Sequence, residues 1–105
     1  MPTFGLVAKK ELQLDTSPGE ALERAQEAVT ALSGTVTGSD PASGCINAKV
    51  PSSAWSWGER LTIVVQPHAP AGSLVNIKSR SWMPFNVFNF GKNRRNVEFI
   101  SRSLA

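Results

Sequence analysis

One sharply delimited amphipathic helix limits the folds open to this sequence. Ser17 can cap the helix, Pro18 suits its first position, and Glu20 can complete a capping box. Apolar residues then recur at spacings of three, four and three, and Gly34 is predicted to end the helix as its left-handed residue. These apolar residues are Leu22, Ala25, Val29 and Leu32. A helix with a single apolar face requires an apolar surface to pack on.

Most of the remaining chain before residue 82 predicts β-strands, because apolar and polar residues alternate. Lys10 falls on the inward phase of the first strand, which indicates a bulge or a strand end at the rim of the sheet. The predicted strands are Phe4–Leu14, Thr35–Thr37, Cys45–Val50, Glu59–Gln66 and Ser73–Ser81.

A second amphipathic helix is predicted from about Lys92 to Leu104. Its stripe consists of Asn93, Val97, Ile100 and Leu104. The element order is therefore β-α-β-β-β-β-α. We expect an α+β fold in which consecutive hairpins form an antiparallel sheet and both helices cover the same face. Residues 1–105 are expected to form a single domain.

The face of the sheet away from the helices is predicted to be polar to basic. It could be solvated, form a dimer surface, or provide a platform for a nucleic acid. The alternation assigns to it Asn47, Lys49, Thr62, Val64, Gln66, Asn76, Lys78 and Arg80.

Composition excludes several classes of protein. Eleven Lys and Arg against eight Asp and Glu give a net charge of +3, which is below the dense basicity typical of nucleic-acid binders. No apolar run approaches the roughly 18 residues of a membrane span, and the N-terminus lacks the order of a signal peptide. We therefore expect a cytoplasmic protein without a membrane partner.

The inventory of reactive side chains argues against an enzyme. The single cysteine, Cys45, excludes an internal disulfide and a multi-cysteine metal site. No phosphate-binding loop, catalytic triad or paired carboxylates are recognisable, so an enzyme would depend on one carboxylate such as Glu59. We predict no catalytic residues, no metal and no cofactor.

The segment from Ser81 to Asn96 is the least ordinary in the chain, because it is rich in aromatic and asparagine residues. Trp55, Trp57 and Trp82 could gather at one end of the sheet and line a ligand pocket with Asn86 and Asn89. The residues of this region predicted to contact a ligand or partner are Trp57, Trp82, Phe85 and Asn89. Such rings more often close the open end of a core, since aromatic side chains bury large areas.

Three cations, Lys92, Arg94 and Arg95, fall in the first turn of the second helix, where they oppose the helix dipole. They could hold an anion there, or the helix could begin earlier, near Asn89. Phe99 lies opposite the apolar stripe among cations. It could contact a partner, or be covered by the first helix or by the 82–90 segment.

The pairing of Ser56-Trp57-Gly58-Glu59 with Gly91-Lys92-Asn93-Arg94-Arg95-Asn96 resembles small uncharacterised bacterial domains, and this resemblance implies no function. The element order is similar to the TATA-binding-protein-like fold class, but without phenylalanine wedges for the minor groove. START-type lipid-binding proteins have a related layout, and this chain is shorter than their large cavity requires.

These observations predict a non-enzymatic binding or assembly module. Its contact surface, for a protein partner or for self-association, is predicted around residues 82–95 with Trp57 and Phe99. The alternative is a binder of an anionic ligand or nucleic acid. That alternative uses the basic residues Lys49, Lys78, Arg80, Lys92, Arg94 and Arg95.

Overall fold

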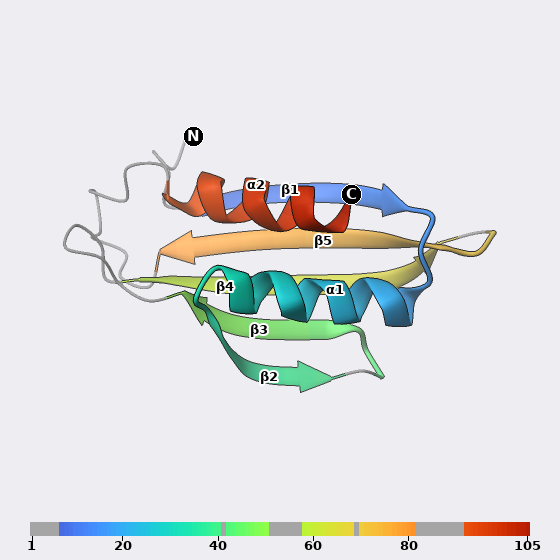
Figure 1. Ribbon diagram of the computed structural model, residues 1–105, viewed down its shortest axis with the longest axis horizontal. Coiled ribbons are helices and arrows are strands. Elements are labelled where there is room, and N and C mark those ends of the chain that lie inside the picture. Colours follow the sequence, from blue (N-terminus) through green and yellow to red (C-terminus); the bar gives the residue numbers. More distant parts are fainter. Residues whose placement is uncertain (1–6, 41, 51–57, 69, 82–91) are drawn as a thin grey trace.

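A computed structural model describes residues 7–40, 42–50, 58–68, 70–81 and 92–105 of the chain. The described residues form a five-stranded antiparallel sheet and two helices (Figure 1). The strand order across the sheet is β1-β5-β4-β3-β2. The elements are β1 (Val7–Leu14), α1 (Pro18–Ala31), β2 (Thr35–Asp40), β3 (Cys45–Val50), β4 (Glu59–His68), β5 (Gly72–Ser81) and α2 (Lys92–Leu104).

The predicted α+β class, element order and antiparallel pairing are confirmed. Strands β2 to β5 form a meander, and β1 joins it beside β5. Both helices cross the same face of the sheet. Helix α1 lies over the β3–β4 side and α2 over β1 and β5, and the two helices contact each other (Figure 1). No helix in the described ranges is long and apolar enough to cross a membrane.

Helix α1 begins as its sequence predicts and ends differently. The Ser17 side chain accepts a hydrogen bond from the Glu20 N–H at 3.3 Å, whereas the Glu20 carboxylate accepts one from Arg24 instead of closing a capping box. The left-handed residue is Ser33, with φ of 62°, and not Gly34. Gly34 is instead needed for close packing, because a Cβ there would lie 2.9 Å from the Val29 carbonyl oxygen.

Three strands extend beyond their predicted bounds, since β4 continues to His68, β5 begins at Gly72 and β2 is longer at its end. β2 continues to Asp40 because a register shift between Val36 and Gly38 lets the chain keep pairing with β3. Lys10 requires no bulge, since β1 pairs with β5 in continuous register. The predicted strand end at Lys10 is wrong as well, because Lys10 lies in the middle of β1, and its side chain is exposed because β1 is an edge strand.

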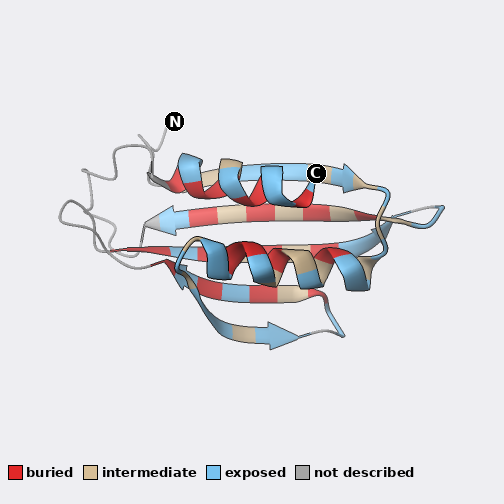
Figure 2. Cartoon of the chain, in the orientation of Figure 1, coloured by how far each residue is buried: buried red, intermediate tan, exposed pale blue. Residues whose placement is uncertain are grey.

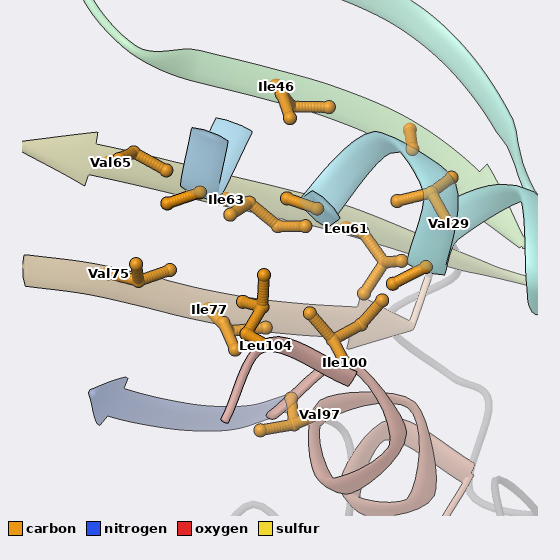
Figure 3. Close-up of a cluster of buried hydrophobic side chains, with 14 of the residues drawn as sticks. Val29, Ile46, Leu61, Ile63, Val65, Val75, Ile77, Val97, Ile100 and Leu104 are labelled. Carbon is orange, nitrogen blue, oxygen red and sulfur yellow. The ribbon is translucent and has the colours of Figure 1, made fainter. Parts of the chain in front are cut away.

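The core fills the space between the helices and the sheet. Alternate residues of each central strand are buried there, whereas their neighbours are exposed or half-buried (Figure 2). Val29 of α1, Ile46, Leu61 and Ile77 of the sheet and Ile100 of α2 are all at most 1% exposed and point toward one another (Figure 3). Leu22 and Leu32, at the two ends of the predicted α1 stripe, are only partly buried.

Candidate functional site on the helix-free face

The face of the sheet opposite the helices carries two adjacent rows of cations, set by the strand register. Arg60 of β4 lies directly between Arg80 of β5 and Lys49 of β3, and these three residues form the first row. In the second row Lys9 of β1 pairs with Lys78 of β5. Directly paired residues have Cβ atoms about 4.5–5.5 Å apart, so the five positive charges are crowded together. We call these five residues the cationic rows.

The cationic rows have no acidic partners. In the part of the chain that the structure describes, none of their five side chains forms an ion pair, whereas Arg24 pairs with Glu20 on α1. The next row of paired residues along the strands, which we call the third row, contains Glu11 of β1 opposite Asn76 of β5. Glu11 is the carboxylate nearest to the cationic rows on the helix-free face. Like charges placed directly opposite one another destabilise a sheet, so this arrangement has a cost in stability.

A hollow of about 470 Å³ opens over four of the five cations, Lys49, Arg60, Lys78 and Arg80. Thr37, Asn47 and Thr62 add neutral hydrogen-bonding groups to its wall, and the Thr62 hydroxyl donates to the Asn47 side-chain oxygen at 3.3 Å. A second hollow of about 430 Å³ adjoins it over Lys9, Glu11, Val64 and Asn76, with Lys78 and Thr62 shared between the two. Both volumes lie within the range of roughly 300–1,000 Å³ found for small-molecule sites.

A buried polar network occupies the opposite side of the sheet at the same end. The Asn96 amide donates to Glu59 Oε1 at 3.1 Å and to Ser79 Oγ at 3.2 Å, and the Ser79 hydroxyl donates to Asn93 Oδ1 at 2.7 Å. All four residues are at most 2% exposed. The network joins the first residue of β4 to the end of β5 and to α2, so it fixes how α2 sits on the sheet.

The sequence-predicted site residues fall into three groups. The first group lies outside the described residues and consists of Trp57, Trp82, Phe85 and Asn89. The alternative start of α2 near Asn89 lies outside them as well. Lys92 is the first described residue of α2, and Arg94, Arg95 and Phe99 follow it as exposed residues, Phe99 being 38% exposed. The third group, Lys49, Lys78 and Arg80, lies on the helix-free face.

The structure therefore separates the predicted basic surface into two parts. Lys78 and Arg80 point away from the helices, whereas Arg94 and Arg95 are exposed on α2, on the other side of the sheet. The predicted basic residues are therefore divided between the two sides of the sheet.

Three important residues were missed by sequence reasoning. Arg60 follows the same alternation as Thr62 and could have been assigned to the helix-free face. Lys9 was placed on the outward phase of its strand, but its position opposite Lys78 depends on the pairing of strands far apart in sequence. Asn96 lies three residues after Asn93 and four before Ile100, so helical spacing places it on the buried side of α2.

Several solved structures share this fold at low sequence identity. The di-domain ARO/CYC protein BexL from the BE-7585A biosynthetic pathway aligns with a TM-score of 0.62 and 12% identity, over 93% of this chain and 46% of BexL. TTHA0849 from Thermus thermophilus aligns with a TM-score of 0.59 and 14% identity, over 93% of each chain. Ara h 8.0201 aligns with a TM-score of 0.51 and 6% identity, over 93% of this chain and 96% of that one.

These likenesses show the fold alone, an α+β arrangement of one antiparallel sheet and two helices. This chain spans less than half the length of BexL. No protein-family description matches the sequence. No curated protein matches it either. The predicted similarities to the TATA-binding-protein-like class and to small bacterial domains remain predictions.

Proposed function

We propose that this protein is a non-enzymatic binding module that holds an anionic ligand against the helix-free face of its sheet. The observation that carries the proposal is the crowding of five cations in two adjacent rows, where the described residues supply no acidic partner. These cations are Lys9, Lys49, Arg60, Lys78 and Arg80. A bound anion would relieve the repulsion among these charges. Charge-assisted hydrogen bonds to arginine and lysine are among the stronger polar contacts available to a protein surface.

The layout of the sheet supports a binding role in a second way. The helix-covered face is filled by the core, so the fold leaves the helix-free face available without loss of packing. The hollow over the cationic rows has both charged and neutral hydrogen-bonding groups in its wall. Such a wall suits an anion with several oxygen atoms.

Retention on immobilised heparin, a general polyanion, tests this proposal. The double variant Arg60→Gln/Arg80→Gln should elute at a clearly lower salt concentration than the wild type, because it loses two charges from the first row. The matched control is Arg94→Gln/Arg102→Gln, which removes two exposed arginines from α2 and gives the same net charge. Equal shifts for the two double variants would show that total charge, and not the helix-free face, governs retention.

A contact surface around residues 82–95, with Trp57 and Phe99, is the second candidate. The exposure of Phe99 at 38% on α2 favours it, because large apolar side chains exposed on a surface can mark a protein contact. Light scattering over a range of protein concentrations tests it. If Phe99 mediates self-association, the mass of the wild type rises with concentration and that of Phe99→Ala does not.

A further inference from the structure

Positive charge on the helix-free face is confined to a small area. The cationic rows extend across four neighbouring strands, from β1 to β3, which is about 14 Å at the ordinary strand spacing. Along the strands the two rows are two residues apart, which is about 7 Å. In the first row the neighbours beyond the cations are uncharged, Val7 on β1 and Thr35 on β2. Across the strands the positive area therefore extends no further than about 14 Å.

On the side of Lys9 and Lys78, the next row of paired residues along the strands carries no positive charge. The third row contains Glu11, Asn76, Val64 and Cys45, and its register ends at Asp40 on β2. Among the described residues, a long polyanion running along the strands toward the third row would leave the cations after about 7 Å and approach two carboxylates. The patch suits a compact ligand better than a polymer.

The chemistry of the helix-free face also disfavours nucleic-acid bases. Proteins that bind single strands combine a basic groove with aromatic side chains on which bases stack. Among the described residues, no aromatic side chain lines either hollow on this face. Within the described residues, this face therefore offers no ring on which the bases of a nucleic acid could stack.

The first row contains a pair of arginines suited to phosphate. Arg60 and Arg80 are directly paired across β4 and β5, so two planar guanidinium groups are presented at the same level of the sheet. A guanidinium can donate two parallel hydrogen bonds to one phosphate, whereas a lysine acts as a single point charge. Lys49 and Lys78 flank this pair in the same hollow, together with the hydroxyl of Thr62.

Resting on the proposed function, we infer that the helix-free face is a site for a compact polyphosphate. Linked phosphates concentrate several negative charges in a short length, which matches the small area of the cationic rows. The Arg60–Arg80 pair holds the phosphate oxygens, and Lys9, Lys49 and Lys78 neutralise the remaining charge. The same chemistry is offered by inorganic triphosphate and by the phosphate chain of a nucleoside triphosphate.

Isothermal titration of the full chain, at constant ionic strength, tests the inference. The probes are orthophosphate, inorganic triphosphate, a nucleoside triphosphate and a single-stranded oligothymidylate. Triphosphate should bind about ten-fold or more tightly than orthophosphate, since it adds at least one charge-assisted contact. If inorganic and nucleoside triphosphate bind with similar affinity, the phosphate chain alone is recognised. If the nucleoside triphosphate binds about ten-fold more tightly, recognition of the phosphate chain alone is overturned.

The conservative variant Arg60→Lys/Arg80→Lys separates this inference from the broader proposal. It keeps every charge, so heparin retention should stay close to that of the wild type. It loses the paired guanidinium groups, so triphosphate affinity should fall about ten-fold. Arg102→Gln, which removes an exposed arginine of α2 outside both candidate surfaces, should leave triphosphate affinity unchanged. Thermal unfolding of each variant confirms that it is folded.

Two results would overturn the compact-polyphosphate inference while leaving the proposed function intact. The first is equal affinity for orthophosphate and triphosphate, with heparin retention still dependent on Arg60 and Arg80. The second is tighter binding of the oligothymidylate than of triphosphate, with no effect of the lysine variant. If triphosphate does not bind, and heparin retention does not depend on Arg60 and Arg80, the proposed function is overturned as well.

Discussion

Leu61 and Arg60 are neighbours in β4, yet Leu61 is 1% exposed in the core and Arg60 lies in solvent on the helix-free face. The same contrast runs along β5, where Ile77 is buried between Asn76 and Lys78. One face of the sheet is therefore defined by packing against α1 and α2, and the other by charge. Because side chains alternate along a strand, the two faces can differ in chemistry without any change of backbone.

The two faces also differ in what they contribute to stability. The helix-covered face removes apolar surface from water, which is the main favourable term in folding. The helix-free face places Arg60 opposite Arg80 and Lys9 opposite Lys78, which opposes folding. The opposed cations lower stability, so stability does not explain their presence. This is the reason for proposing that the helix-free face binds a ligand.

The largest effect is expected from a pair of neighbouring substitutions on β4. Ile63→Ala removes a fully buried side chain and should lower the free energy of unfolding by about 2–5 kcal/mol. Val64→Ala, on the half-buried helix-free face, should cost clearly less, about 1 kcal/mol or below. Urea unfolding of both variants measures the difference. Equal losses would show that the helix-free face is packed against something in solution.

A smaller effect is expected from the buried polar network beneath the cationic rows. Asn96→Ala removes the amide that donates to Glu59 and Ser79, so two buried acceptors lose a donor. The expected loss is about 1–3 kcal/mol in the free energy of unfolding. Ser103→Ala is the control on the same helix, because its hydroxyl donates to the Phe99 carbonyl oxygen in an exposed position. A loss no greater than that of the control would contradict a structural role for the network.

Much of this fold follows from sequence periodicity. Ser17 capping α1, the buried stripe of Val97, Ile100 and Leu104, and the outward direction of Lys49 and Lys78 all follow from spacing within one element. The cationic rows as a unit do not, because they depend on register. Sequence alternation gives each strand its two faces, but not which residue of β1 lies opposite Lys78.

The predicted basic surface shows a different limit of sequence reasoning. Arg80 and Arg94 are close in sequence and were grouped together as basic residues. A strand directs alternate side chains to opposite faces, and α2 then packs on one of those faces, so the two arginines end on different sides of the sheet. Grouping residues by charge and sequence position alone ignores this geometry.

Removing the repulsion on the helix-free face should stabilise the protein. Arg60→Gln/Arg80→Gln abolishes two directly opposed pairs of cations, Arg60–Arg80 and Lys49–Arg60. The expected gain is about 0.2–1 kcal/mol for each relieved pair at low salt, decreasing as salt screens the charges. Thermal unfolding at low and high salt measures it. Arg94→Gln/Arg102→Gln provides the control, and an equal gain for that variant would assign the effect to net charge.

The smallest effect, and the finest comparison of the two faces, comes from consecutive lysines on β1. Lys9 points to the helix-free face opposite Lys78, whereas Lys10 lies opposite Ile77 on the helix side and is exposed at the rim. Lys9→Gln should therefore raise the free energy of unfolding by a few tenths of a kcal/mol at low salt, and Lys10→Gln should leave it unchanged.

This pair is informative because the two variants are almost identical in other respects. Each removes one positive charge from adjacent positions of the same edge strand, so net charge, strand propensity and the unfolded chain are matched. A salt-dependent gain at Lys9 alone requires a specific neighbour of like charge in solution, and the strand register supplies Lys78 as that neighbour. If both variants gave the same gain, the register that creates the cationic rows would be wrong, and the anion site would lose its structural basis.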